Sequence, residues 1–117
     1  MYIVYGIPNC NTVKKTFTWL NDHNLPYTFH NYKTAGITTN TLKKWCKQTN
    51  WSNLLNKKSA TWRELSKTLS LSVTNEKAAI KIMAEYTSSI KRPIIEKDGI
   101  IITIGFDENE YQKLFLV

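Results

Sequence analysis

The chain has 117 residues, 42% of them hydrophobic and 21% charged, which is typical of one globular domain and not of a disordered segment. It holds no apolar run long enough to span a membrane and no signal-peptide pattern at its start, so we expect a cytoplasmic protein without a membrane partner. Two cysteines and two histidines are too few for a disulfide-rich secreted fold or a Cys/His metal cluster, so we expect no bound metal.

The net charge of +7 is concentrated in one part of the chain. Residues 1–67 hold ten basic and two acidic side chains, a net charge of +8, whereas residues 68–117 hold six and seven, a net charge of −1. A basic segment of this kind either forms a lysine-rich solvated surface or attracts an anionic partner. The lack of a recognised DNA-reading motif argues against direct DNA binding.

The first third of the chain predicts a strand, a helix and a second strand. Residues 2–6 form a β-branched and aromatic run, and a turn at Pro8 precedes a helix predicted over residues 11–23. A second strand is predicted at Tyr27 and Phe29. Such a crossover connection implies parallel pairing of the two strands. The apolar stripe of the predicted helix consists of Val13, Phe17 and Leu20, flanked by Thr16 and Trp19.

The rest of the chain predicts a helical block followed by a hairpin and a helix. Residues 34–90 show short helical patterns without strand signals, with caps at Thr38 or Thr39, at Ser59 or Thr61, and at Thr74 or Asn75. Strands are predicted at 94–96 and 100–104, joined by an Asp98–Gly99 turn, before a helix capped by Asp107. This order is that of an α/β thioredoxin-like fold (βαβ…ββα) with an inserted helical subdomain.

Cys10 lies in the loop before the first predicted helix. If that helix begins near Asn11, unpaired backbone N–H groups and the positive end of the helix dipole favour the thiolate and lower the pKa of the thiol. Lys14, one turn further on, would add a positive charge. The alternative is a small buried side chain, but the flanking residues are polar and turn-forming, which favours a nucleophile. Small hydrogen-bonding groups surround it at Asn9, Asn11 and Thr12.

Two other positions bear on this cysteine. Cys46 follows Trp45 on a predicted helix face, which favours core packing; the alternative is a resolving partner for Cys10, which requires Cα atoms within about 7 Å. Arg92 carries a planar fork suited to oxyanions and carboxylates, and Pro93 marks a strand edge, a first strand residue or a special turn. If their strand lies beside the first, both approach Cys10; otherwise Arg92 is a surface arginine.

Four stretches together resemble the arsenate reductase-like (ArsC/Spx) family, which includes glutaredoxin-coupled arsenate reductases, Spx regulators and YffB-type proteins. They are "YGIPNCNTVKK", "LLNKKSATWREL", "IKRPII" and "IGFDENEYQKLF", and the YffB type is the most similar. The resemblance implies one domain over residues 1–117, with a thioredoxin-like core at 1–33 and 91–117 and a helical insert at 34–90. It also implies a reactive Cys10 and a cis peptide bond between Arg92 and Pro93.

The chain departs from this family at several functional positions. Arsenate reductases carry a histidine where this chain has Gly6, and arginines at the places of Lys14, Asn56 and, approximately, Gly105. Of the expected arginines only Arg92 remains, which weakens the expectation of arsenate reduction. Spx regulators commonly carry a CxxC pair, and its second position here is Val13.

The sequence therefore predicts a monothiol thiol reductase that depends on glutathione or a glutaredoxin. In this hypothesis Cys10 is the nucleophile, Lys14 lowers its pKa, and Arg92 holds an anionic group such as a glutathione carboxylate. Substrate-binding residues are predicted at Asn9, Asn11, Thr12 and Pro93. We expect no bound cofactor, with glutathione or another external thiol as co-substrate. The alternatives are an Spx-like adaptor that binds the α subunit of RNA polymerase and a glutaredoxin-coupled arsenate reductase.

Overall fold

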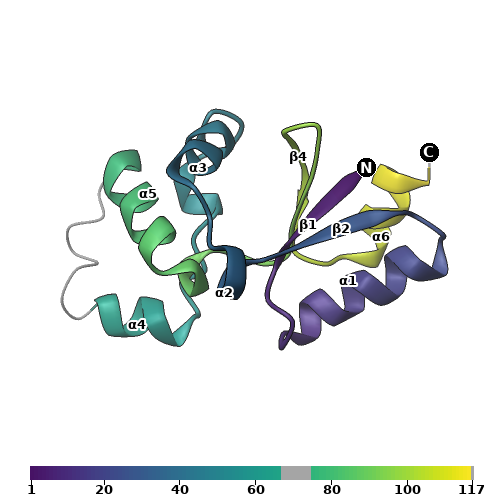
Figure 1. The fold of residues 1–117 in the computed structure, drawn as a ribbon, viewed down its shortest axis with the longest axis horizontal. Coiled ribbons are helices and arrows are strands. Elements are labelled where there is room, and N and C mark those ends of the chain that lie inside the picture. Colours follow the sequence, from purple (N-terminus) through teal and green to yellow (C-terminus); the bar gives the residue numbers. More distant parts are fainter. Residues whose placement is uncertain (67–74, 117) are drawn as a thin grey trace. The chain divides into compact units, whose positions relative to one another are not determined.

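The computed structural model describes residues 1–66 and 75–116, and the chain forms two compact units. The first consists of Met1–Tyr32 and Arg92–Val117, and the second of Lys33–Lys91. Figure 1 shows the sheet of the first unit and the helices of the second. Among the described residues, no helix combines the length and the apolar character needed to cross a membrane.

The first unit is built on a four-stranded sheet in the order β2-β1-β3-β4. Strand β1 (Tyr2–Gly6) pairs in parallel with β2 (Tyr27–Asn31) and antiparallel with β3 (Ile94–Lys97), which pairs antiparallel with β4 (Ile100–Ile104). Both the parallel crossover and the hairpin are as predicted. Asp98 and Gly99 have φ angles of 54° and 81°, as a tight hairpin turn between twisted strands requires. The arrangement confirms the thioredoxin-like α/β fold.

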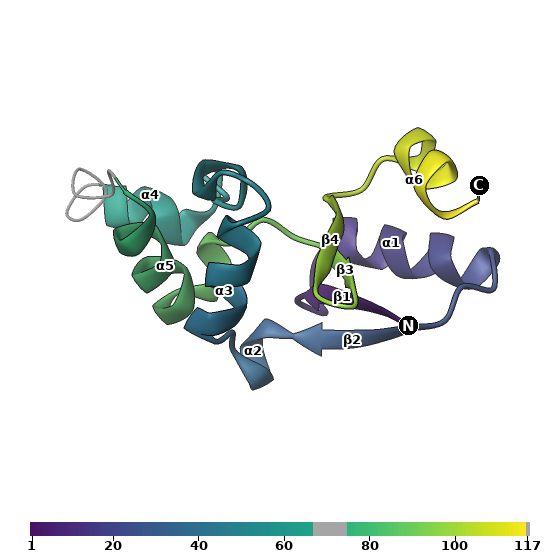
Figure 2. The same ribbon diagram turned by 90° about the horizontal axis from the view of Figure 1, so that it is seen from above.

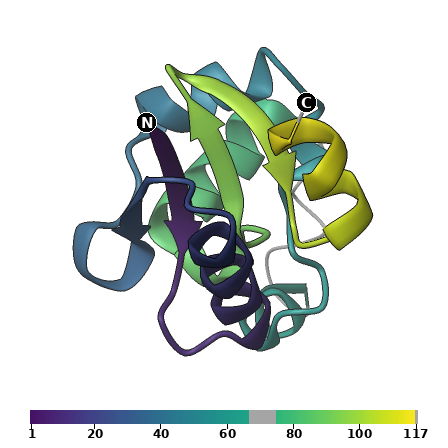
Figure 3. The same cartoon turned by 90° about the vertical axis from the view of Figure 1, so that its right-hand side faces the viewer.

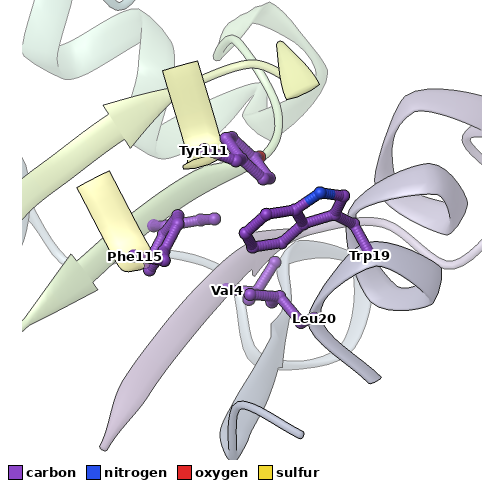
Figure 4. Packing of buried hydrophobic residues seen from close by; sticks show 6 residues of the cluster. Val4, Trp19, Leu20, Tyr111 and Phe115 are labelled. Carbon is purple, nitrogen blue, oxygen red and sulfur yellow. The ribbon is translucent and has the colours of Figure 1, made fainter. Parts of the chain in front are cut away.

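Helices α1 (Asn11–Asp22) and α6 (Glu108–Phe115) cover one face of this sheet (Figure 3). In α1 the buried face differs from the predicted stripe, because Thr16 is fully buried whereas Phe17 is only half-buried. Phe17 instead stacks on Tyr27 at the edge of the sheet, with 5.3 Å between ring centroids. The core cluster on this face is formed by Val4, Trp19, Leu20, Ile95, Tyr111 and Phe115 (Figure 4).

A chain of hydroxyl groups explains why a threonine is tolerated in this core. The Tyr111 hydroxyl donates to the carbonyl oxygen of Gly105 at 2.6 Å and lies 3.1 Å from Thr16 Oγ1. Thr16 Oγ1 also lies 3.1 Å from the carbonyl oxygen of Thr12, so its single proton is shared between that oxygen and the oxygen of Tyr111. Burial raises the pKa of Tyr111 to about 12, so this hydroxyl stays protonated and remains a donor. The network joins α1, α6 and the segment after β4.

The second unit consists of short helices, shown from another side in Figure 2. They follow α2 (Tyr32–Ala35), which begins at the boundary, and are α3 (Thr39–Cys46), η1 (Trp51–Asn53), α4 (Ala60–Ser66), α5 (Glu76–Glu85) and η3 (Thr87–Ser89). Three predicted caps are present: Thr38, Ser59 and Asn75 accept backbone N–H groups. Thr74, the other candidate for the third cap, lies outside the described residues.

In the described part of this unit, pairing of the β type is limited to one isolated antiparallel bridge. It joins Leu55 to Ile90, and the Lys91 N–H donates to the carbonyl oxygen of Leu54 at 2.7 Å. Leu54, Leu55 and Ile90 are buried, so the bridge ties the segment after η1 to the end of the unit. The sequence predicted no strand here, and the described residues form none beyond this bridge.

Replacing the Tyr111 hydroxyl tests the network that joins α1 and α6. Tyr111→Phe removes the donor to the Gly105 carbonyl oxygen, so we expect the free energy of unfolding to fall by about 1–3 kcal/mol. Urea titration followed by circular dichroism measures the loss. Tyr27→Phe is the matched control, because the described residues offer its hydroxyl no hydrogen bond and it is only half-buried. Equal losses in both variants would contradict the assigned role.

Candidate functional site

Cys10 is the N-cap residue of α1. Its backbone is extended, with φ −132° and ψ 122°, and its carbonyl oxygen accepts the Lys14 N–H at 2.9 Å. At this position a side-chain oxygen of Ser, Thr, Asp or Asn usually accepts one of the first free N–H groups of the helix. Here a sulfur takes that place, and the thiol makes no capping hydrogen bond. A thiolate accepts hydrogen bonds more strongly than a thiol does, so the free N–H groups of the helix stabilise the thiolate form of Cys10 more than the thiol form.

The surroundings of Cys10 lower the pKa of its thiol below the ordinary value. Partial burial is the largest effect and raises the pKa, because it disfavours the charged form. The backbone N–H groups of Val13 and Thr12, together with hydrogen bonding and positive charge from Arg92, lower it by more in total. The direction agrees with the prediction from the helix N-terminus. Lys14 is exposed and is not one of these groups, so its role in lowering the pKa stays a prediction.

Arg92 reaches the thiol because β3 lies antiparallel beside β1. It is half-buried and directly precedes the buried Pro93, and the peptide bond between them is cis, as the resemblance implied. The carbonyl oxygen of Pro93 accepts the Gly105 N–H at 2.8 Å, which ties this corner to the end of β4. The structure therefore brings Cys10 and Arg92 together, out of segments more than eighty residues apart.

The end of β1 and the first turn of α1 approach each other very closely. A Cβ atom added to Gly6 would lie 2.8 Å from Cγ2 of Val13, nearer than two such carbons can come without a shift. The same atom would lie 3.8 Å from Cβ of Arg92. Val13 is fully buried and β-branched, so it has little freedom to give way. Glycine at position 6 is what permits this packing.

A group of buried polar side chains near Arg92 was not predicted. The Tyr5 hydroxyl donates to Glu96 Oε1 at 2.9 Å, and Glu96 is only 8% exposed. Tyr32 is 2% exposed, and its hydroxyl has no hydrogen-bond partner among the described residues. Burial raises its pKa well above the ordinary value, with further raising effects from Tyr5 and Glu96 and an opposing one from Arg92. A glutamate inside the apolar run "IIEK" was the sequence signal for this group.

The remaining predicted site residues surround the thiol to different degrees. Asn9 and Asn11 are exposed on either side of Cys10, and Thr12 is half-buried. Their contact with a substrate stays a prediction. Among the described residues, no cluster of three or more His, Cys, Asp or Glu side chains offers a place for a metal ion.

Cys46 belongs to the second unit and differs from Cys10 in its chemistry. It is half-buried rather than in the core, whereas its neighbours Leu42 and Trp45 are fully buried. Burial and the nearby negative charge of Glu76 raise the pKa of its thiol. The pKa values of the two thiols are therefore shifted in opposite directions, and Cys10 is the cysteine whose surroundings favour the thiolate.

The sequence profile of the ArsC family matches residues 5–114. This range includes the loop that carries Cys10, the whole second unit and the segment around Arg92. The chain belongs to the ArsC family. An uncharacterised protein of Haemophilus influenzae is 44% identical over 98% of this chain and 99% of its own length. This confirms the family resemblance seen in the sequence motifs.

Two further relatives show the range of this family. The solved structure of the YFFB (PA3664) protein is 36% identical, covers 97% of this chain and 98% of its own, and has a TM-score of 0.86. The global transcriptional regulator Spx 1 of Lactococcus lactis is 29% identical over 94% of this chain and 85% of its own length. The ArsC-family chain is thus similar both to a YffB-type structure and to a regulator.

The contact between Gly6 and Val13 predicts a strong coupling between the two positions. Gly6→Ala overpacks this contact and should lower the free energy of unfolding by about 1–3 kcal/mol. In a Val13→Ala background the same change should cost less than half as much, because the obstructing methyl groups are gone. A double-mutant cycle by urea denaturation measures the coupling. Additive effects would show that the contact does not limit position 6.

The opposite pKa shifts of the two cysteines predict different pH profiles of alkylation. In Cys46→Ser, where only Cys10 reacts, the iodoacetamide rate should rise with an inflection at lower pH than that of a free cysteine in the same assay. In Cys10→Ser, where only Cys46 reacts, the inflection should lie above it. The sign follows because only the thiolate reacts, and a lowered pKa supplies thiolate at lower pH.

The same assay identifies the cation that acts on Cys10. Arg92→Gln should move the Cys10 inflection upward, since it removes a hydrogen-bond donor and a positive charge. Lys14→Gln is the comparison with an equal loss of charge. A larger upward movement for Lys14→Gln than for Arg92→Gln would reverse the assignment.

Proposed function

We propose that this ArsC-family protein is a monothiol thiol reductase in which Cys10 is the nucleophile and an external thiol completes the cycle. The observation that carries the proposal is the position of Cys10 as the N-cap of α1, with Val13, Thr12 and Arg92 as donors to its thiolate. A thiolate kept at low pKa reacts readily with disulfides at neutral pH. Glutathione or a glutaredoxin is the proposed external thiol.

The proposed cycle has three exchange steps. The Cys10 thiolate attacks one sulfur of a substrate disulfide, forming a mixed disulfide and releasing the other sulfur as a thiolate, which takes up a proton from water. A first external thiolate attacks the substrate sulfur in that mixed disulfide or the Cys10 sulfur itself, and a second completes the exchange. In total one substrate disulfide gains two electrons and two protons, and two external thiols become one disulfide.

Neighbouring residues have distinct proposed roles in this cycle. Arg92 lowers the pKa of the thiol and, with its planar fork, would bind a carboxylate such as one of glutathione. Pro93 would shape the surface along which an extended substrate lies. Asn9, Asn11 and Thr12 would donate or accept hydrogen bonds from the substrate backbone.

The same geometry disfavours the two better-known chemistries of the family. The histidine of arsenate reductases has no room at Gly6 while Val13 stays in place, and Gly105 has a φ of 88°, which an arginine would adopt only with strain. The position that would hold the second cysteine of a CxxC pair is occupied by Val13, which is fully buried and has no thiol. The external thiol is therefore the simpler way to resolve the adduct.

Similarity to the Spx 1 regulator favours a second candidate function. In that case the protein would be an adaptor that binds the α subunit of RNA polymerase, without a CxxC redox switch. The basic stretch of residues 1–67 would supply charge for such an interaction. This candidate does not require Cys10 to react.

Mass spectrometry of the intact protein after treatment with oxidised glutathione tests the proposed reductase. We expect one glutathione on the wild type and on Cys46→Ser, none on Cys10→Ser, and loss of the adduct when reduced glutathione is added. The adduct should form more slowly in Arg92→Gln, because less thiolate is present. A Cys10–Cys46 disulfide instead of the adduct would replace the external thiol by an internal one.

A pull-down with the C-terminal domain of the RNA polymerase α subunit separates the adaptor from the reductase. Binding that Cys10→Ser retains, together with no adduct on Cys10 in the wild type, would favour the adaptor. An adduct without α-subunit binding supports the reductase.

A further inference from the structure

Helices α3 and α5 of the second unit border an open groove of about 1080 Å³. Four lysines line it, Lys43 and Lys47 from the α3 side and Lys77 and Lys81 from α5. Each pair is spaced by four residues, so both members lie on the same face of their helix. We call this feature the lysine groove. It shares no residue with the Cys10 site.

The lysine groove also has apolar lining. Ala78, Ile80 and Ala84 contribute to it from α5, and Ile80 is 5% exposed. The aliphatic stems of the lysines extend this apolar surface, while their ammonium groups stay in water. Two carboxylates, Glu76 and Glu85, belong to the lining but stand at the first and last residues of α5. The groove thus combines an apolar floor with a surplus of positive charge along its length.

The four lysines outnumber the two carboxylates of the groove, Glu76 and Glu85. Within residues 1–66 and 75–116, none of them forms an ion pair with a carboxylate. All four are exposed, so their charges are available to a partner. Placing four ammonium groups along one apolar groove has no evident benefit for the fold itself, since like charges repel.

We propose that the lysine groove binds an acidic amphipathic helix of a partner protein. The apolar stripe of such a helix would lie on Ala78, Ile80 and Ala84, and acidic residues beside the stripe would meet the lysines. The ten residues of α5 span about 15 Å, which matches about three turns of a bound helix. This inference concerns recognition and does not depend on the reaction of Cys10.

Charge and shape together favour a protein helix over a nucleic acid. A phosphate backbone would meet the lysines, but it has no group suited to the apolar floor. The carboxylates of Glu76 and Glu85 would repel either anionic partner and do not distinguish between the two. An amphipathic helix satisfies both parts of the groove. Nucleic-acid binding is accordingly an outcome that the test must separate.

Fluorescence anisotropy with a labelled synthetic peptide tests the proposal on the full-length protein. The probe is a peptide of about 14 residues with leucine at every third or fourth position and glutamate or glutamine elsewhere. We expect micromolar binding that weakens as salt is added, as contacts between exposed charges do. Lys43→Glu/Lys81→Glu, which reverses one charge on each side of the groove, should weaken binding at least about tenfold.

The matched control changes the same number of charges outside the groove. Lys44→Glu/Lys113→Glu replaces two exposed lysines that do not line it, and it should weaken binding less than about threefold, as net charge alone would do. Circular dichroism confirms that both variants fold, and alkylation of Cys10 should be unchanged in both. Unchanged alkylation keeps this test independent of the proposed reductase.

Three results would overturn the proposal. Equal weakening in the two variants would show that binding follows net charge and not the groove. Single-stranded DNA that binds as tightly as the acidic peptide, with the same loss in Lys43→Glu/Lys81→Glu, would assign the groove to nucleic acid. Sedimentation that shows self-association of the protein, abolished in this variant, would assign it to a second copy of the chain.

Discussion

The close approach of α1 to the end of β1 is the constraint on which the thiol site depends. Gly6 has no side chain, so Val13 packs directly against the strand end, at a distance that a Cβ atom would not allow. This fixes the first turn of the helix relative to the sheet, and with it the short loop that carries Cys10. The sulfur therefore lies where the free N–H groups of Thr12 and Val13 favour its thiolate.

The balance between burial and hydrogen-bond donors decides the chemistry of each cysteine. Both thiols are half-buried, and in both cases burial is the largest effect and raises the pKa. At Cys10 two backbone N–H groups and Arg92 outweigh burial, whereas at Cys46 the carboxylate of Glu76 adds to it. Burial alone thus says little about the reactivity of a cysteine. What distinguishes Cys10 is its place at a helix N-terminus beside an arginine.

Local patterns predicted the parts of this structure that depend on neighbouring residues. The start of α1, the hairpin turn and the cap at Asp107 follow from residues a few positions apart, and the sequence indicated all three. Two contacts between polar side chains were not predicted, because each joins segments far apart in the sequence. Thr16 is buried because it meets the hydroxyl of Tyr111, 95 positions away, and Tyr5 meets Glu96 at a separation of 91. Hydrophobic spacing carries no information on such partners.

The approach of Arg92 to Cys10 also depends on distant segments, so the sequence alone did not decide it. The antiparallel pairing of β3 with β1 decides it.

The charge available at the thiol also bears on the substrate. A compact oxyanion with several negative charges needs several donors around it. A side chain at position 6 would meet Val13, and one at position 105 would be strained by the φ of 88°. With Arg92 as the cation that acts on Cys10, the site can neutralise one carboxylate or one thiolate at a time. That is enough for exchange between sulfur atoms, in which the negative charge moves from the attacking sulfur to the leaving one without increasing. With Arg92 beside its thiol, the site therefore suits the disulfide substrate that we propose better than a compact oxyanion.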